Sequence, residues 1–482
     1  MDFLQDLGGN YLMNRLKRLL IGISDPILRS NRRGMSQSID SVRQKVISHK
    51  KKSKLAQILY NGTNWLRDFN IPMRDMYRQL NLKKTQWWSK NELEALQNKY
   101  LRHLIKHAYQ HVPFYHKLFQ KRGLRPDDIK TKDDLVKLPI TTKKLMRNNY
   151  DWFSCPVYRL GTFKSSGTSG TPWRYHWSHL WIQIWENIIW RGWNWAGYTK
   201  GKRMASFLSG SLGNVALAPA GMIAGGNVNT VKLENLIQQL KAYKPQHFYV
   251  FPKAAYIVAK YLLEQNDYSI QVESVITTSE PLYDWQREVI EEVFQCKVFD
   301  EWGSNDGANT AHECSEHCGM HHAAERNIIE IVDGRIIATD LWNYALPFIR
   351  YENGDAGIWL DECPCGRKLP LLKVYGRKYD FIFTKTEIIF PNIIWYRLLN
   401  FAVGIDSLQI VQKSLDSIEL KVVKGRNFSD FEFQRAIAEV KDLLKGMDVK
   451  VSFLDKIPLT PAGKWRNVIN ETKKDISDYL ST

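Results

Sequence analysis

Residues 164–173 read KSSGTSGTPW, and they include eight consecutive small or turn-forming residues, from Ser165 to Pro172. None of these side chains can fill a hydrophobic core, yet the run lies inside a 482-residue chain that is 44% apolar and 12% aromatic. The strand-like segment VYRLGTF precedes the run, and a tryptophan-rich helical pattern follows it. A strand, a Gly/Ser/Thr loop and a helix together form a phosphate cradle, because backbone N–H groups, hydroxyls and the helix N-terminus attract the anion.

The composition of this run does not by itself distinguish a phosphate-binding loop from a linker. It lacks the GxxxxGK[ST] pattern of a Walker loop. Flexible linkers have the same composition, so the linker interpretation stays open until the rest of the chain is considered.

The chain that follows alternates between strand and helix patterns from residue 204 to about residue 340. Strand candidates are MASFLSG, HFYVF, SVITTS and KVFDEWG, and helix candidates are ENLIQQLKAY, AAYIVAKYLLEQ and YDWQREVIEEVF. Such alternation predicts an α/β architecture with largely parallel sheets. Before the glycine-rich run, residues 92–120 show the apolar spacing of a helix, followed by a stop marked by proline.

The tryptophan-rich segment WSHLWIQIWENIIWRGWNWAGY predicts a helix. Trp177, Trp181 and Trp185 are four residues apart and would share one helical face. That face either belongs to the core, which is the favoured interpretation, or lines an apolar pocket along one edge.

Beyond residue 377 the pattern changes. SLQIVQKS and SIELKVVKG predict a hairpin, residues 428–447 predict a helix with Ser429 as N-cap and Glu432 three residues on, and VKVSFLDKI predicts a closing strand. We therefore predict three parts: a basic helical extension (1–80), a large α/β domain of several sheets (81–376), and a small mobile α+β lid domain (377–482). The hinge is expected around residues 375–381.

The net charge is +18 with a pI near 9.4. Residues 1–54 hold twelve Lys/Arg against four Asp/Glu, a net charge of +8, beside apolar residues at helical spacing (Leu12, Leu16, Leu19, Leu20 and Ile23). Such a segment either binds an anionic membrane or a protein partner, or is a plain solvated extension. Nucleic acid is disfavoured, because no zinc-finger, RNA-recognition or helix-turn-helix signature is present.

The predicted location is the cytoplasm, with a peripheral position at the inner face of the membrane as a variant. No apolar stretch approaches the roughly 18–20 residues of a membrane span, and the N-terminus is a poor secretory signal.

Five further motifs follow the glycine-rich run: SEPL (279–282), DEWGSNDG (300–307), RYENGD (350–355), YGRKYD (375–380) and PLTPAGKWR (458–466). In this order and spacing the set resembles the adenylate-forming superfamily of acyl-CoA synthetases and adenylation domains. Within it, the chain is most similar to the phenylacetate–CoA ligase branch and its relatives from capsule and exopolysaccharide biosynthesis. The resemblance covers roughly residues 90–482.

The resemblance implies a role for each motif. The phosphate loop, which would hold the β- and γ-phosphates of ATP, comprises Ser165, Ser166, Gly167, Thr168, Ser169, Gly170 and Thr171. Ser279, Glu280 and Pro281 would border the adenine and acyl pocket. Trp302, followed by Gly303, stands where the family usually has a tyrosine against the adenine ring.

The charged residues of the motifs receive roles in the same way. Asp306 takes the place of a family glutamate that faces Mg²⁺ or phosphate, Asp355 would bind the ribose hydroxyls, and Arg377 would meet ribose or phosphate. Asp380 marks the hinge, and Lys464 would bridge the ATP phosphate and the acyl carboxylate. Because joining a carboxylate to ATP brings two anions together, cations must offset charge at the α-phosphate. A lysine on a mobile domain could do so and then leave.

Plain structural interpretations remain for single motifs, since GKWR can be a solvated basic turn and ENGD can simply shape a turn. The chain also departs from the family pattern. Trp173, with Arg174 next, stands where a lysine usually follows the proline of the phosphate loop. Asp306 is one methylene shorter than glutamate, and FTKTEIIFP replaces the Arg-Gly turn after Asp380. These changes bring the rate and the second half-reaction into question.

Four of the six cysteines fall in two close pairs, which is typical of metal ligation. HECSEHCGMHH (312–322) and CPCG (363–366) offer Cys314, His321, Cys363 and Cys365, a Cys₃His set that suits structural Zn²⁺. Related branch members carry an EC…GxH plus CxC arrangement that matches these positions. Cys318, His312, His317 and His322 compete as ligands, and free thiols are the alternative.

The resulting prediction is a ligase that uses ATP and Mg²⁺ to turn a small carboxylic acid into an acyl-adenylate and pyrophosphate. An acceptor thiol or amine then takes the acyl group, with coenzyme A expected by resemblance. One alternative is an adenylate-forming enzyme that acylates a sugar amine or carrier in capsule or exopolysaccharide biosynthesis. The other is an inactive scaffold that keeps the fold. The sequence leaves the acid and the oligomeric state open.

Overall fold

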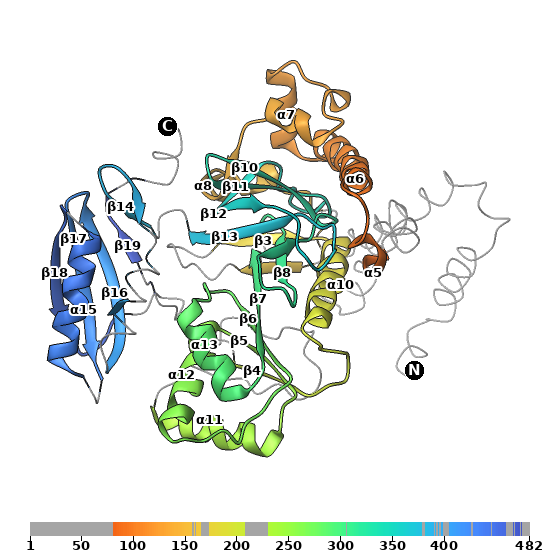
Figure 1. Cartoon of the computed structure of the whole chain (residues 1–482). Coiled ribbons are helices and arrows are strands. Elements are labelled where there is room, and N and C mark those ends of the chain that lie inside the picture. Colours follow the sequence, from red (N-terminus) through yellow and green to blue (C-terminus); the bar gives the residue numbers. More distant parts are fainter. Residues whose placement is uncertain are drawn as a thin grey trace, which may run out of the picture. The chain divides into compact units, whose positions relative to one another are not determined.

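In the computed structural model of the chain, the largest sheet among the described residues has eleven strands (Figure 1). Ten of them lie in the order β10-β11-β12-β13-β9-β8-β7-β6-β5-β4, and β1 (Thr141–Thr142) pairs with β12. Its two halves differ in strand direction, and the candidate site residues lie on strands of both halves.

The structure describes residues 81–156, 159, 161–164, 173–207, 230–304, 306–377, 381–389, 391, 394, 397–398, 404–425, 428–444, 446–458, 466, 468–472 and 474. The predicted basic extension (1–80), the loop Ser165–Thr171, Asp380 and Lys464 lie outside these residues. The chain divides into two units, residues 1–74 and 75–482. The domain boundaries at 80/81 and 376/377 stay predictions.

One half of the sheet is parallel. It consists of β4 (Met204–Phe207), β5 (His247–Val250), β6 (Ser274–Thr278) and β7 (Lys297–Ser304). The helices between these strands are α11 (Thr230–Tyr243), α12 (Pro252–Glu264) and α13 (Asp284–Phe294). Phe248, Val275 and Val298 of the strands share one core with Leu262 and Ile290 of the helices. The predicted alternation of strands and helices is confirmed here.

The other half is antiparallel and contains β8 (Asn309–Glu313), β9 (Met320–His322), β10 (Asn327–Val332), β11 (Arg335–Asp340), β12 (Tyr351–Leu360) and β13 (Leu371–Arg377). Within residues 204–340, for which largely parallel sheets are predicted, the prediction is right for β4 to β7 and wrong for β8 to β11. Several connections here are too short for a parallel crossover, which needs a dozen or more residues. Between β10 and β11 the chain turns through Asp333 and Gly334 alone, both at positive φ, as a two-residue hairpin requires.

Helices α5 (Leu82–Thr85), α6 (Lys90–His111), α7 (Pro113–Lys121), α8 (Lys143–Asn148) and α9 (Tyr150–Phe153) precede the glycine-rich run. Residues 92–120 thus form two helices, since Pro113 is the first residue of α7, where its missing N–H costs no hydrogen bond. Ser89 and Glu92 close a capping box at the start of α6.

The glycine-rich run joins β2 (Gly161–Lys164) to β3 (Arg174–Trp177), which pair antiparallel. The prediction that a helix directly follows the run is therefore wrong, because β3 comes first and α10 (His179–Trp195) begins only after it. Trp177 consequently ends a strand and does not belong to the helix. Trp181 is fully buried and stacks on Trp185 with ring centroids 6.3 Å apart, which supports the core interpretation of the tryptophan face.

The C-terminal α+β part has a separate sheet in the order β18 (Asp448–Phe453), β17 (Ser417–Lys424), β16 (Ile405–Ser414), β19 (Val468–Asn470). The short strands β14 (Ile382–Phe383) and β15 (Ile388–Ile389) pair with each other. Helix α15 (Asp430–Leu443) packs Phe433 and Val440 into a core with Leu408 and Leu420. The predicted hairpin and the Ser429 N-cap are confirmed.

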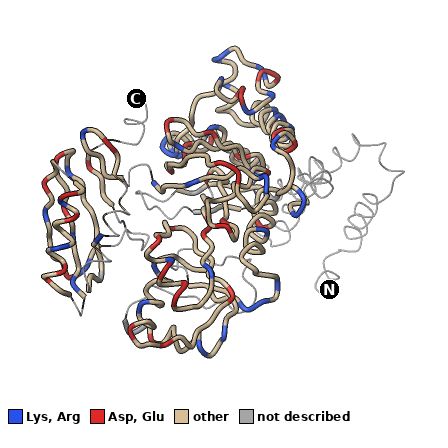
Figure 2. The backbone as a smooth tube through the Cα atoms, viewed as in Figure 1, with Lys and Arg blue, Asp and Glu red and all other residues tan. Residues whose placement is uncertain are grey.

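Charges of both signs mix on the described elements, as on α15 (Figure 2). Within the described part of the chain, no helix combines the length and the apolar character that crossing a bilayer would require.

Candidate nucleotide and metal sites

The predicted adenine and ribose residues lie on strands far apart in the sheet order but touch through their side chains. Trp302 is on β7 and Asp355 is on β12, with β8, β9 and β13 between them. The Trp302 Nε1 nevertheless donates to Asp355 Oδ2 at 3.1 Å. Neighbouring strands lie about 4.8 Å apart, so two side chains could not bridge four such steps on a flat sheet. The sheet therefore curves here and brings the two motifs to one place.

Asp355 is surrounded by donors. Asn353 Nδ2 donates to Oδ2 at 2.8 Å, and Arg377 Nε lies 3.2 Å from Oδ1. Asp355 and Arg377 are register partners across β12 and β13, which explains their contact. Burial raises the pKa of Asp355, and the Arg377 charge and the Trp302 hydrogen bond offset part of that rise.

Asp306 lies in the turn between β7 and β8 and has a different environment. Ser304 Oγ donates to Oδ1 at 2.9 Å, Tyr351 OH donates to Oδ2 at 3.0 Å, and Lys143 Nζ lies 3.6 Å from Oδ2. Burial opposes ionisation of Asp306, but the Lys143 and Arg377 charges, together with the hydrogen bonds from Ser304 and Tyr351, hold its pKa below the usual value. Asp306 is thus a charged carboxylate of the kind that holds Mg²⁺ beside phosphates.

The turn Ser279–Pro281 follows β6 and lies against the end of β13. Ser279 has a positive φ of 70°, an uncommon conformation for a residue other than glycine. A Cβ at Gly376 would lie 3.7 Å from Pro281 Cγ, so the turn is next to the strand that carries Arg377. Gly303 lies on β7 directly after Trp302. The structure thus brings Trp302, Gly303, Asp306, Asp355 and Arg377 into one region with the turn beside them.

The predicted site also includes the phosphate loop and Lys464. The phosphate-loop residues Ser165–Thr171 and Lys464 lie outside the described residues, so their roles stay predictions. Trp173, which follows the proline of the loop, is 2% exposed, and its ring contacts Tyr175 and Phe348. The position where the family has a lysine is therefore occupied by a core residue.

Four residues that contact the two carboxylates were not predicted from the sequence. Ser304 belongs to the DEWGSNDG motif and donates to Asp306. Tyr351 and Asn353 belong to the RYENGD motif, but the motif itself does not say which side chains reach Asp306 or Asp355. Lys143 begins α8, and β1 pairs with β12 in parallel just before it, which brings the lysine to Asp306. The sequence TTKK (141–144) contains no pattern that predicts a contact between Lys143 and Asp306.

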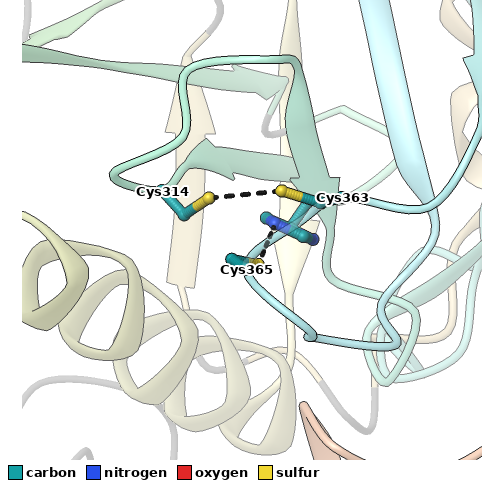
Figure 3. A group of neighbouring side chains, drawn as sticks. Cys314, Cys363 and Cys365 are labelled. Carbon is teal, nitrogen blue, oxygen red and sulfur yellow. Dashed lines mark hydrogen bonds between the residues drawn. The ribbon is translucent and has the colours of Figure 1, made fainter.

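The predicted metal ligands do come together (Figure 3). The ligand atoms of Cys314, His321, Cys363 and Cys365 all lie within 4.8 Å of one another. Cys314 Sγ and Cys363 Sγ are 3.6 Å apart, and Cys365 Sγ lies 3.3 Å from His321 Nε2. Zn–S bonds of 2.3 Å in a tetrahedron imply sulfur separations of about 3.8 Å, so these residues fit a zinc ion.

The environment of His321 also suits a ligand. Burial lowers the pKa of His321 to about 4, which keeps the imidazole neutral. Its Nδ1 lies 3.4 Å from the Leu369 carbonyl oxygen, and this leaves Nε2 for the metal. The competing histidines have other partners: His312 lies near Glu301, His317 near Glu313, and His322 near the Asn327 carbonyl.

Comparisons with known proteins agree with this arrangement. The family model described as the CapK C-terminal domain matches residues 385–471. A phenylacetate–coenzyme A ligase of Thermus thermophilus is 24% identical, with 80% of this chain and 98% of that protein covered. Protein CapK of Staphylococcus aureus is 25% identical over 52% of this chain and 59% of that protein. A crystal structure of 2-hydroxyisobutyryl-CoA ligase with R3-HIB-AMP aligns at TM-score 0.68 and 21% identity, covering 80% of this chain and 91% of that one.

The fold is therefore that of the adenylate-forming CoA ligases, with a large α/β part followed by a small C-terminal domain. In sequence, the chain is similar to phenylacetate–coenzyme A ligases and to CapK.

Proposed function

We propose that the chain is an ATP-dependent ligase that activates a carboxylic acid as an acyl-adenylate, releases pyrophosphate, and passes the acyl group to coenzyme A. The observation that carries this proposal is the convergence of Trp302, Asp306, Asp355 and Arg377 from three strands and a turn into one region. The homology to phenylacetate–coenzyme A ligases supports the same reaction class.

The described residues suggest how a nucleotide would be held. Asp355, fixed by Arg377 and Trp302, would accept hydrogen bonds from the ribose hydroxyls, and the Trp302 ring would lie against adenine. Asp306 would hold Mg²⁺ beside the phosphates, and the bound ion would offset the negative charge that develops at the α-phosphate. Arg377, whose side chain is 43% exposed, can still turn toward ribose or phosphate. Ser279, Glu280 and Pro281 would border the adenine and acyl pocket.

The remaining steps depend on residues outside the described part. The loop Ser165–Thr171 would hold the β- and γ-phosphates, and Lys464 would lie between the carboxylate and the α-phosphate. A rotation of the C-terminal domain around residues 375–381 would remove Lys464 after adenylation and admit the thiol. Zn²⁺, held by Cys314, His321, Cys363 and Cys365, would have a structural role, because four protein ligands leave no open position.

A second acceptor is favoured by one observation. The CapK C-terminal domain model matches the part of the chain that would present the acceptor, and CapK itself is a relative. A sugar amine or carrier of capsule or exopolysaccharide synthesis could therefore replace coenzyme A. A cytoplasmic location, with the basic residues 1–54 contacting an anionic membrane or a protein partner, would fit this alternative.

A pyrophosphate-exchange screen with aryl, fatty and amino acids tests adenylation. Exchange with at least one acid is expected, and Lys464→Ala should lose it by orders of magnitude while remaining folded. Undiminished exchange in that variant would contradict the role of Lys464, and absence of exchange with every acid would favour an inactive scaffold. Product analysis with and without coenzyme A then distinguishes the two acceptors.

A further inference from the structure

A fourth sulfur lies beside the three sulfurs and the one imidazole of the predicted metal group. Cys318 is exposed, and its Sγ lies 3.2 Å from Cys363 Sγ, closer than the sulfur of Cys314. Cys363 is buried and belongs to the ligand group, whereas Cys318 does not. An accessible thiol is therefore in contact with a buried thiol that has a proposed structural function.

The local structure fixes this contact. Cys318 belongs to the turn between β8 and β9, in which the His317 N–H donates to the Cys314 carbonyl at 3.2 Å. Arg287 of α13 binds both carboxylate oxygens of Glu313, at 2.8 and 2.9 Å, and lies 3.3 Å from His317 Nδ1. On the other side of Cys318, a Cβ at Gly319 would lie only 2.8 Å from Leu360 Cδ1, so the backbone approaches the end of β12 closely.

We propose that Cys318 is an oxidation site whose modification removes Cys363 from the metal group. The inference rests on the proposed Cys₃His ligand set and is independent of the ligase reaction. It requires a two-electron oxidant, for which hydrogen peroxide is the simplest. The exposed sulfur is the one that such an oxidant reaches first.

The chemistry balances in two steps. The Cys318 thiolate attacks one peroxide oxygen, the O–O bond breaks, and Cys318 becomes a sulfenic acid while hydroxide leaves. The Cys363 sulfur then attacks the Cys318 sulfur, an S–S bond forms, the S–O bond breaks, and hydroxide leaves and takes a proton as water. Cys363 would then no longer be available as a metal ligand, because a disulfide sulfur is a poor ligand compared with a thiolate.

The experiment uses the full-length chain loaded with zinc, at one zinc per chain by elemental analysis. Zinc release after addition of hydrogen peroxide is followed with a chromogenic chelator, and peptide mapping identifies disulfides. Cys318→Ser is compared with the parent chain and with Cys296→Ser, a partly exposed cysteine outside the group. The ligase reaction is not part of the readout, so loss of adenylation and loss of this response can be told apart.

The parent chain and Cys296→Ser are expected to form the Cys318–Cys363 disulfide and to release zinc together. Cys318→Ser should bind zinc normally, form no such disulfide and release zinc about tenfold more slowly, since the remaining sulfurs of the group are buried (Cys314, Cys363) or only partly exposed (Cys365). The inference is overturned if no Cys318–Cys363 disulfide forms, or if Cys318→Ser releases zinc as fast as the parent. It is also overturned if Cys318→Ser purifies without zinc, because Cys318 would then be a ligand itself.

Discussion

Asp355 and Arg377 face each other across β12 and β13, with the Arg377 Nε 3.2 Å from Asp355 Oδ1. The second oxygen of the same carboxylate accepts the indole N–H of Trp302 at 3.1 Å. The carboxylate is therefore held from two sides, by a strand neighbour and by a residue four places away in the sheet. The orientation and the charge of the Asp355 carboxylate therefore both depend on Trp302, a residue to which the family resemblance assigns only stacking on adenine.

Replacement of Trp302 by Phe keeps an aromatic ring for adenine but removes the hydrogen bond to Asp355. Hydrogen bonds to charged groups contribute about 1.5–3 kcal/mol, so the KM for ATP should rise by roughly tenfold or more. Because the indole N–H lowers the pKa of Asp355, the acidic limb of the pH profile should move to higher pH in the variant. Initial rates of pyrophosphate exchange across pH measure both effects.

Trp359→Phe is the matched control, since Trp359 lies on the same strand β12 and is 40% exposed. Its KM and pH profile should equal those of the parent. A Trp302→Phe enzyme with a raised KM but an unmoved acidic limb would contradict the electrostatic part of the argument.

Replacement of Lys143 by Met should lower the free energy of unfolding, because it removes a charge that stabilises the ionised Asp306 carboxylate. The lysine charge helps to hold the folded-state pKa of Asp306 below its unfolded value, so this stabilisation is present above about pH 4 and disappears as the pH falls through the folded pKa. Lys143 is one-third exposed, and we expect a loss of no more than about 1 kcal/mol at pH 7.

Urea unfolding at pH 7 and in the range below pH 4 tests this expectation, with the neighbouring and more exposed Lys144→Met as control. The difference between parent and Lys143→Met should shrink at the acidic pH. A difference that is equal at both values would show that the lysine acts through packing alone.

Removal of the metal should destabilise the large sheet. Cys314 directly follows β8, His321 is on β9, and Cys363 and Cys365 lie after β12, so a bound ion would tie together three pieces of backbone. A ligand that binds only the folded state adds its binding free energy to stability, and several kcal/mol correspond to a fall in Tm of roughly 10 °C on chelation.

Cys363→Ser should start at the lower Tm and show no further change on chelation. Differential scanning calorimetry with and without chelator provides the measurement. If chelation leaves the Tm of the parent unchanged, the free-thiol interpretation of the cysteines is correct.

The buried pair Arg191–Glu325 should be far more important for stability than surface pairs. Arg191 Nη1 lies 2.6 Å from Glu325 Oε1, Thr85 donates to the same oxygen at 2.6 Å, and Glu325 is fully buried. Glu325→Gln leaves the guanidinium buried without its counter-charge, which costs about 3–5 kcal/mol.

Equilibrium unfolding measures this loss. Glu362→Gln, which breaks the exposed Lys368–Glu362 pair, is the control and should change stability little. Equal losses of stability in Glu325→Gln and Glu362→Gln would mean that neighbouring groups compensate for the missing charge of Glu325.

The sequence by itself determined the elements whose pattern is local. The alternation in residues 204–304 and the Ser429 cap could be read directly, because apolar periodicity and capping depend on neighbours a few residues away. The ordered motifs also identified the fold, and the spacing of Cys314, His321, Cys363 and Cys365 anticipated the group that the structure brings together.

Only the tertiary structure decided which residues face one another. The antiparallel half of the sheet, the strand after the glycine-rich run and the contacts of Lys143, Tyr351 and Asn353 depend on sheet pairing between distant segments. The Trp302–Asp355 hydrogen bond requires a curved sheet, and the proximity of Cys318 to Cys363 requires a turn held by Arg287. No local pattern encodes such contacts, because their free energy comes from burial and from charges that meet only after the chain has folded.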